Sequence, residues 1–394
     1  MQTESVSAWR LLPFVSIVFL GFLSIALPLP VLSLRVHDEL GFSLVTAGWA
    51  VGLQALATIL TRQMAGVLID RRGPKLAALM GLPMAALAGV TYLASAFITD
   101  PTASLAVLLL GRVIMGPAES LFLTASMSWG IVTLGARRAG VVMTWQGIAM
   151  FLALGIGAPV GLFVMARLGF AGVAAAVVVL PLAGLLVALS QRAVAPAAKA
   201  QRASFLGVIG LVWRQGAVLA LATAPQPILG SFVALYFASR GWEGAGLCLS
   251  GFGIGYILVR LFFAHLPDRL GGRRVASWSL VLEAFGQALL WRAPTAPLAL
   301  LGATLTGAGF SLIFPSMGVE ALRRVPASSQ ALAIASFNAF LDLSLGLAAP
   351  LAGVIVGIGG YPSVFMAGGL GCLLGASLLL GRERPAGPVR AAAD

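Results

Sequence analysis

The chain has 394 residues, of which 59% are hydrophobic and only 10% charged, and its formal net charge is +12. A soluble domain carries roughly a quarter charged residues, so this composition excludes an ordinary soluble protein and indicates a polytopic α-helical membrane protein. Its apolar runs are much longer than the ~10-residue alternating strands of a membrane β-barrel.

Twelve apolar runs follow one another, each long enough to cross a hydrocarbon core about 30 Å thick. The first is too long for the apolar core of a cleaved signal peptide. Six runs lie in residues 1–190 and six in residues 216–394, on either side of a small, basic linker at 191–215 whose end, 205–215, is compatible with a surface helix. The predicted spans are 11–34, 44–66, 75–97, 103–131, 141–165, 170–190, 217–238, 246–266, 275–291, 298–321, 331–356 and 362–381.

The basic residues are distributed unequally between the two sides of the predicted membrane. With the N-terminus inside, the inner segments hold 18 of the 25 Lys and Arg residues and the outer loops hold 4. The other three, Arg62, Arg112 and Arg260, lie inside spans. By the positive-inside rule this places both termini in the cytoplasm of a bacterial inner membrane, and it explains the charge of +12 without a nucleic-acid partner.

A charged turn occurs twice, at 66–75 and again 198 residues later at 265–274. Arg62 and Arg260 each lie eight residues upstream of the aspartate of their turn, again 198 apart. Segments 111–116 and 155–159 align with 302–307 and 346–350 at an offset of 191. The chain therefore reads as a duplication, and two parallel six-helix halves with a site near the midplane are a known transporter plan.

These motifs resemble the major facilitator superfamily over nearly the whole chain. The two charged turns look like its signature after helices 2 and 8, 112–116 like its helix 4 motif, and 155–161 like a degenerate helix 5 antiporter motif in which Ala158 replaces the usual glycine. Segments 27–30, 36–40, 236–242 and 309–315 look like the YfcJ/YhhS subgroup, which is grouped with efflux transporters. The resemblance implies the twelve-helix fold and a direction of transport, but no substrate.

The resemblance also implies a cytoplasmic gate at the charged turns, in which Asp70 meets the positive N-terminal end of helix 11 when the protein opens outward. The predicted gate residues are Gly66, Asp70, Arg71, Gly73 and Lys75 in the first turn, with Asp268, Arg269 and Gly271 in its copy.

Charges inside spans are costly and usually functional or paired. Glu119 and Arg112 are seven residues apart, so they share one face of the fourth span, about 10 Å apart along its axis. We predict that Glu119 binds a proton or a cationic group, and that Arg112 adjusts its proton affinity or holds an anionic group. Alternatively, Arg112 anchors backbone carbonyls and Glu119 is a satisfied structural acid.

Asp342 and Arg62 lie at compatible depths on the eleventh and second spans, which pack together in the family fold, so we predict an ion pair between the halves. Its role is open between a proton-titrating switch and a static salt bridge. Phe151 occupies the place of Asp342 in the first half.

Arg260 and Glu283 also lie at similar depths, in the eighth and ninth spans, and we predict that they form a structural ion pair. The two cysteines, Cys248 and Cys372, show no metal or disulfide spacing, and no metal site is expected. Candidate substrate-lining residues are Trp145, Gln146, Gln226, Phe310 and Asn338.

The best hypothesis is a proton-coupled secondary transporter, not an enzyme, that exports a small organic solute by antiport. Glu119 and Asp342 would carry protons, with Arg112 and Arg62 as partners. No GxxxxGK[ST] motif is present, so we expect a proton gradient as the driving force and no cofactor. The expected partners are the solute, protons and the lipid bilayer, with a monomeric protein. The alternative is a proton symporter importing a sugar or organic acid; a membrane receptor or a lipid-modifying enzyme fits less well.

Overall fold

The computed structural model describes residues 10–135, 139–194, 205–325 and 330–380, which contain helices and no strand. The first half begins with a broken helix, α1 (Leu12–Ala26), α2 (Leu29–Leu34) and the π-helical turn η2 (Arg35–Glu39). Pro28 and Pro30 stand at this break, where a missing backbone N–H interrupts the helical ladder. Then follow α3 (Leu44–Arg72), α4 (Pro74–Phe97), α5 (Pro101–Leu134) and α6 (Ala139–Ser190).

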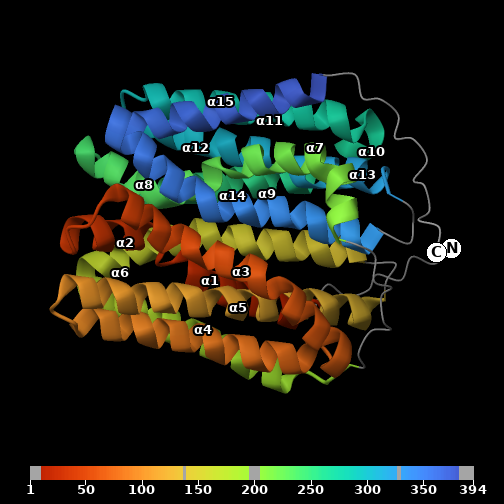
Figure 1. Cartoon of the computed structure of the whole chain (residues 1–394), viewed down its shortest axis with the longest axis horizontal. Helices are drawn as coiled ribbons and strands as arrows, with labels where there is room; N and C mark the ends of the chain where they lie inside the picture. Colours follow the sequence, from red (N-terminus) through yellow and green to blue (C-terminus); the bar gives the residue numbers. More distant parts are fainter. Residues whose placement is uncertain (1–9, 136–138, 195–204, 326–329, 381–394) are drawn as a thin grey trace.

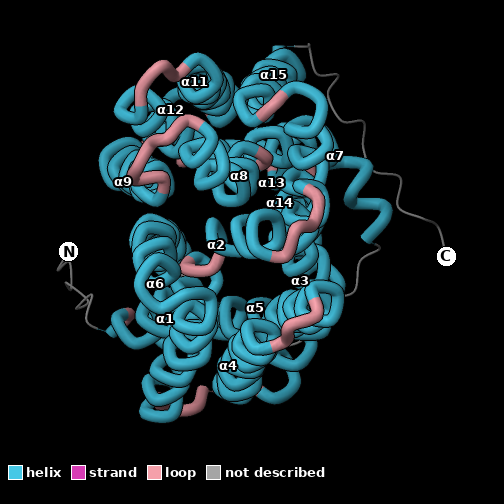
Figure 2. The backbone as a smooth tube through the Cα atoms, turned by 90° about the vertical axis from the view of Figure 1, so that its left-hand side faces the viewer, coloured by secondary structure: helices cyan, strands magenta, loops and turns pink. Residues whose placement is uncertain are grey.

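The second half repeats this plan with more interruptions. Its helices are α7 (Phe205–Thr223), α8 (Pro225–Ser239), α9 (Gly246–Phe263), α10 (Leu266–Leu270), α11 (Gly272–Arg292), α12 (Ala296–Phe310), α13 (Ile313–Leu322), α14 (Gln330–Gly359) and α15 (Tyr361–Leu380). Figures 1 and 2 show the two halves as two bundles side by side, α1–α6 in one and most of α7–α15 in the other.

Ten helical stretches among the described residues are long and apolar enough to cross a membrane. One of them, in α6, is bent at Gly169, whose φ of 64° breaks the helix, so it holds the two predicted spans 141–165 and 170–190. The helix α11 is not among the ten, because Glu283, Gln287 and Arg292 reduce its hydropathy. The all-helical membrane fold is confirmed, whereas the count of twelve spans stays a prediction.

The predicted linker lies partly outside the described residues, at 195–204. Residues 205–215 are the first part of α7, which continues to Thr223, and their expected place on the membrane surface stays a prediction. The sequence from 205 to 223 contains no proline, so no missing backbone N–H interrupts the helix at the expected position.

The halves meet along α3 with α14, α6 with α9, and α2 with α8. At the start of α3, a Cβ added to Gly48 would lie 2.5 Å from the carbonyl oxygen of Ala349, and one added to Gly52 would collide with the carbonyl of Gly346. At the start of α9, a Cβ on Gly246 would lie 2.6 Å from Cα of Pro159. Backbones touch here, so the halves are closed at the end opposite the two charged turns.

This close approach predicts opposite effects for two alanine substitutions on α3. Gly66→Ala is expected to stabilise by up to about 1 kcal/mol, because alanine favours the helix and a Cβ there meets nothing within 4 Å. Gly52→Ala is expected to destabilise by roughly 1–3 kcal/mol, because its Cβ overpacks the α14 backbone. Thermal unfolding of the purified protein in detergent measures both, and equal melting temperatures would contradict the described contact.

The repeated turns also have the same backbone and the same anchoring. Gly73 and Gly271 both adopt φ of 85°, which glycine accepts without steric cost. Lys75 donates a hydrogen bond to the carbonyl of Leu189, at 3.0 Å, and its counterpart Arg273 donates to the carbonyl of Leu379. In each half a basic side chain therefore holds the last carbonyls of the final helix, where a positive charge is favoured.

Candidate functional site

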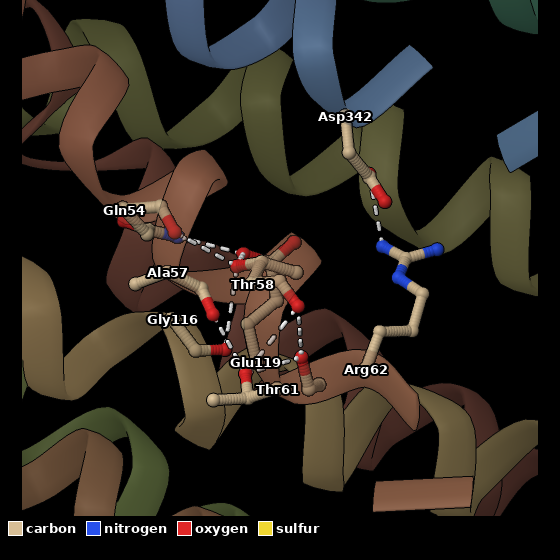
Figure 3. Close-up of polar contacts among 9 residues, drawn as sticks. Gln54, Ala57, Thr58, Thr61, Arg62, Gly116, Glu119 and Asp342 are labelled. Carbon is tan, nitrogen blue, oxygen red and sulfur yellow. Dashed lines mark hydrogen bonds and ion pairs between the residues drawn. The ribbon is translucent and has the colours of Figure 1, made fainter. Parts of the chain in front are cut away.

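Glu119 is the acceptor of a polar cluster between α3 and α5 (Figure 3). Its Oε2 accepts hydrogen bonds from Nε2 of Gln54, at 2.9 Å, and from Oγ1 of Thr58, at 3.1 Å. The Thr58 hydroxyl also lies 3.3 Å from the carbonyl oxygen of Gly116, so α3 and α5 are joined around the carboxylate. The side chain of Glu119 is half-buried, and both of these hydrogen bonds go to one of its two carboxyl oxygens.

The predicted ion pair between the halves is present. Nη2 of Arg62, on α3, lies 3.0 Å from Oδ1 of Asp342, on α14 (Figure 3). Asp342 is 3% exposed and Arg62 is 32% exposed, so the acid is buried and the arginine reaches it from a more open position. Oδ2 of Asp342 has no hydrogen-bond partner among the described residues. The pair therefore joins the two halves further along α3 than the close contact at Gly52.

Arg112 lies on the same helix as Glu119 but is not its partner. Its guanidinium donates to the carbonyl of Val51, at 2.8 Å, and to the Tyr92 hydroxyl, at 3.3 Å, and the side chain is 1% exposed. These contacts tie α5 to α3 and α4. Of the two roles considered for Arg112, the geometry matches the anchor for a backbone carbonyl, while a role in proton coupling stays untested.

The predicted pair of Arg260 with Glu283 is wrong. Arg260 donates to the carbonyl of Ser311, at 3.2 Å, and its guanidinium lies over the ring of Tyr256. Glu283 is fully buried and interacts with the Cys372 thiol, and neither of its carboxyl oxygens meets Arg260. The two residues lie at a similar depth in the membrane, but their helices are not neighbours. Helix α9 packs on α6 and α12, whereas α11 packs on α12 and α15.

The remaining candidates are scattered. Gln146 and Phe310 are buried, Gln226 and Asn338 are half-buried, and Trp145 is 41% exposed. Of these, Phe310 takes part in an aromatic cluster with Phe151 of the other half. In the charged turns Asp70, Arg71 and Arg269 are exposed, and Asp268 lies in α10 with its side chain outside the described set. The contact that the resemblance implies between Asp70 and the eleventh span, here α14, stays a prediction.

An apolar groove of about 640 Å³ lies beside the cluster, with Met64, Leu68 and Pro117 in its wall. Met64 follows Arg62 by two residues, which is about 200° around α3. The groove is therefore on the face of α3 turned away from the ion pair. We place the candidate site at Glu119, Arg62 and Asp342, where the polar groups converge, and not in this groove.

Two members of the site were missed by the sequence reasoning. Gln54 and Thr58 are 4% and 2% exposed and both bind Glu119. Their spacing in the sequence could have indicated them, because two polar residues four apart on an apolar helix share one face. That pattern predicts a polar stripe on α3, although it does not say which residue the stripe would meet.

Comparisons with known proteins agree with this architecture. The family model described as "Major Facilitator Superfamily" matches residues 14–247 and 226–394. An uncharacterized MFS-type transporter of Salmonella typhimurium is 42% identical over 92% of this chain and 93% of its own length. One from Pseudomonas aeruginosa is 42% identical over 95% and 93%, respectively.

Solved structures show the same fold at low sequence identity. A crystal structure of a mutant of the nucleoside transporter NupG has a TM-score of 0.75 at 18% identity, covering 94% of this chain and 98% of that one. The human organic anion transporter MFSD10 has a TM-score of 0.67 at 16% identity, with the same coverage. With a family model over both halves and relatives above 40% identity, this chain belongs to the major facilitator superfamily.

Proposed function

We propose that this protein is a proton-coupled exporter of a small organic solute in a bacterial inner membrane, with both termini in the cytoplasm, working as a monomer. The observation that carries the proposal is the placement of two intramembrane acids, Glu119 within the first half and Asp342 in the contact between the halves. Acids at this depth are costly unless they serve transport or are paired. One of them is paired across the moving interface.

The geometry supports alternating access in the following way. The tight backbone contacts between the halves lie toward the end opposite the charged turns, which supports a state that opens toward the cytoplasm in the proposed orientation. Rocking of the halves would separate α3 from α14 and break the contact of Arg62 with Asp342. Asp342, losing its counter-charge, would then favour a proton. Glu119 remains with Gln54 and Thr58 within one half, so its carboxyl group can exchange a proton for solute in either state.

Everted membrane vesicles with an inside-acid proton gradient test this proposal. Dyes, antibiotics, sugars, nucleosides and amino-acid-like compounds are added in turn, and the gradient is followed by a pH-sensitive fluorophore. We expect at least one compound to collapse the gradient in vesicles with the protein and not in vesicles carrying the empty vector. Uptake of a compound into intact cells that acidifies them would instead identify a symporter and contradict export.

A further inference from the structure

The two long interfaces between the halves are related by the internal duplication, but only one of them contains an acid. The contact of α3 with α14 corresponds to the contact of α9 with α6. Arg62 of α3 corresponds to Arg260 of α9, at the offset of 198, and Asp342 of α14 corresponds to Phe151 of α6, at the offset of 191. The second interface therefore has the arginine of the ion pair and a phenylalanine in place of its acid.

The structure shows this replacement directly. The ring of Phe151 stacks on Tyr256 with centroids 3.6 Å apart, and the guanidinium of Arg260 lies 5.5 Å from the centroid of Tyr256. Phe252 and Phe310 complete a buried aromatic cluster that closes the contact between α6 and α9. Arg260 is half-buried at the edge of this cluster, as Arg62 is at the edge of its own interface.

Arg260 has no acidic partner in the described part of the chain. It contacts a backbone carbonyl and the side chain of Tyr256, and its Nε is buried without a hydrogen-bond partner among the described residues. The helices in extensive contact with α9 are α6, α8 and α12, and none of them carries an aspartate or a glutamate. An arginine inside a membrane without a counter-charge is costly, which marks a site for an anion.

The α6 residue that faces Arg260 has no side chain. Gly147 lies one turn before Phe151, and a Cβ added to it would stand 3.9 Å from Nη2 of Arg260. The preceding residue, Gln146, is 1% exposed, and neither atom of its amide has a hydrogen-bond partner among the described residues. The cation of Arg260 thus lies against a glycine across the interface between the halves, and the residue next to that glycine carries an unsatisfied amide.

We propose that Arg260 binds an anionic group of the transported solute, which makes the substrate class an organic monoanion such as a carboxylate or sulfonate with an apolar body. The anion supplies to Arg260 the counter-charge that Asp342 supplies to Arg62 in the related interface, and the apolar body lies beside the aromatic cluster. This inference rests on the proposed function for its transport role, but the anion site can be tested by binding alone, without a proton gradient.

The test measures the thermal unfolding of the purified full-length protein in a neutral detergent. The probes are benzoate and benzenesulfonate, compared with neutral benzamide and cationic benzylamine. We expect at least one of the two anions to raise the melting temperature, and the neutral and cationic compounds not to do so. In Arg260→Gln the Kd of that anion should weaken roughly tenfold or more, because a partly buried charge partner is lost.

The duplication supplies a second variant. Phe151→Asp restores the missing acid, should pair with Arg260, and should abolish anion binding, whereas the neutral Phe151→Asn should retain it. Arg292→Gln, which removes an arginine stacked on Trp291 elsewhere in the same half, serves as the matched control. If Phe151→Asp does not purify, Arg260→Gln decides alone.

The proposal is overturned if neither anion stabilises the protein, or if Arg260→Gln binds the anion as the unaltered protein does. Stabilisation by phosphatidylglycerol but by neither soluble anion would also contradict it, since the occupant would then be a lipid headgroup. If the anion binds but no compound collapses the proton gradient in the vesicles, the anion site stands and only the proposed coupling to protons is contradicted.

Discussion

Replacement of Glu119 by glutamine is expected to abolish proton-coupled transport and to leave the protein folded. Glutamine has nearly the same shape, and its carbonyl oxygen can still accept the hydrogen bonds from Gln54 and Thr58. It cannot take up or release a proton, however, so the step that links solute movement to the gradient is lost. Gradient collapse by a compound active with the unaltered protein should fall to the level of empty-vector vesicles.

The control for this result is Glu320→Gln. Glu320 is an acid of the same type on α13, paired with the exposed Arg323 at 3.2 Å. Loss of an exposed pair changes little, so this variant should transport normally. Full coupled transport by both Glu119→Gln and Asp342→Asn would show that neither acid carries the proton, and the proposed mechanism would then be wrong.

The two predicted arginine–acid pairs show which contacts the sequence can predict and which it cannot. Depth along a helix follows from counting residues at about 1.5 Å each, and it placed Arg62 level with Asp342 and Arg260 level with Glu283. The first pair exists because α3 and α14 are neighbours, as the family resemblance implied. The second does not, because a depth says nothing about which helix lies alongside, and α12 packs against both α9 and α11.

The same distinction explains Arg112 and Glu119. Sequence spacing correctly put both on one face of α5, but it could not say which groups of α3 and α4 that face meets. Arg112 meets a carbonyl and a tyrosine, and Glu119 meets an amide and a hydroxyl. Composition predicts the class and the repeated motifs predict the duplication, whereas lateral contacts depend on how helices pack.

Breaking the pair between the halves is expected to destabilise the protein by different amounts according to which partner is removed. Arg62→Ala leaves Asp342, 3% exposed, without its counter-charge and should cost about 3 kcal/mol. Asp342→Ala leaves Arg62, which is 32% exposed and can reach solvent, and should cost about 1 kcal/mol. Thermal unfolding in detergent measures both, and equal losses would contradict the described difference in burial.

The double variant Arg62→Ala with Asp342→Ala measures the interaction between the two side chains separately from what each contributes alone. If the two side chains act on each other, removing both should restore stability relative to Arg62→Ala, because no buried charge is left unpaired. Its coupled transport should stay absent, since the halves lose the contact that forms and breaks as they rock. A double variant no more stable than the worse single variant would remove the support for the pair, and normal transport would show that it is a static salt bridge.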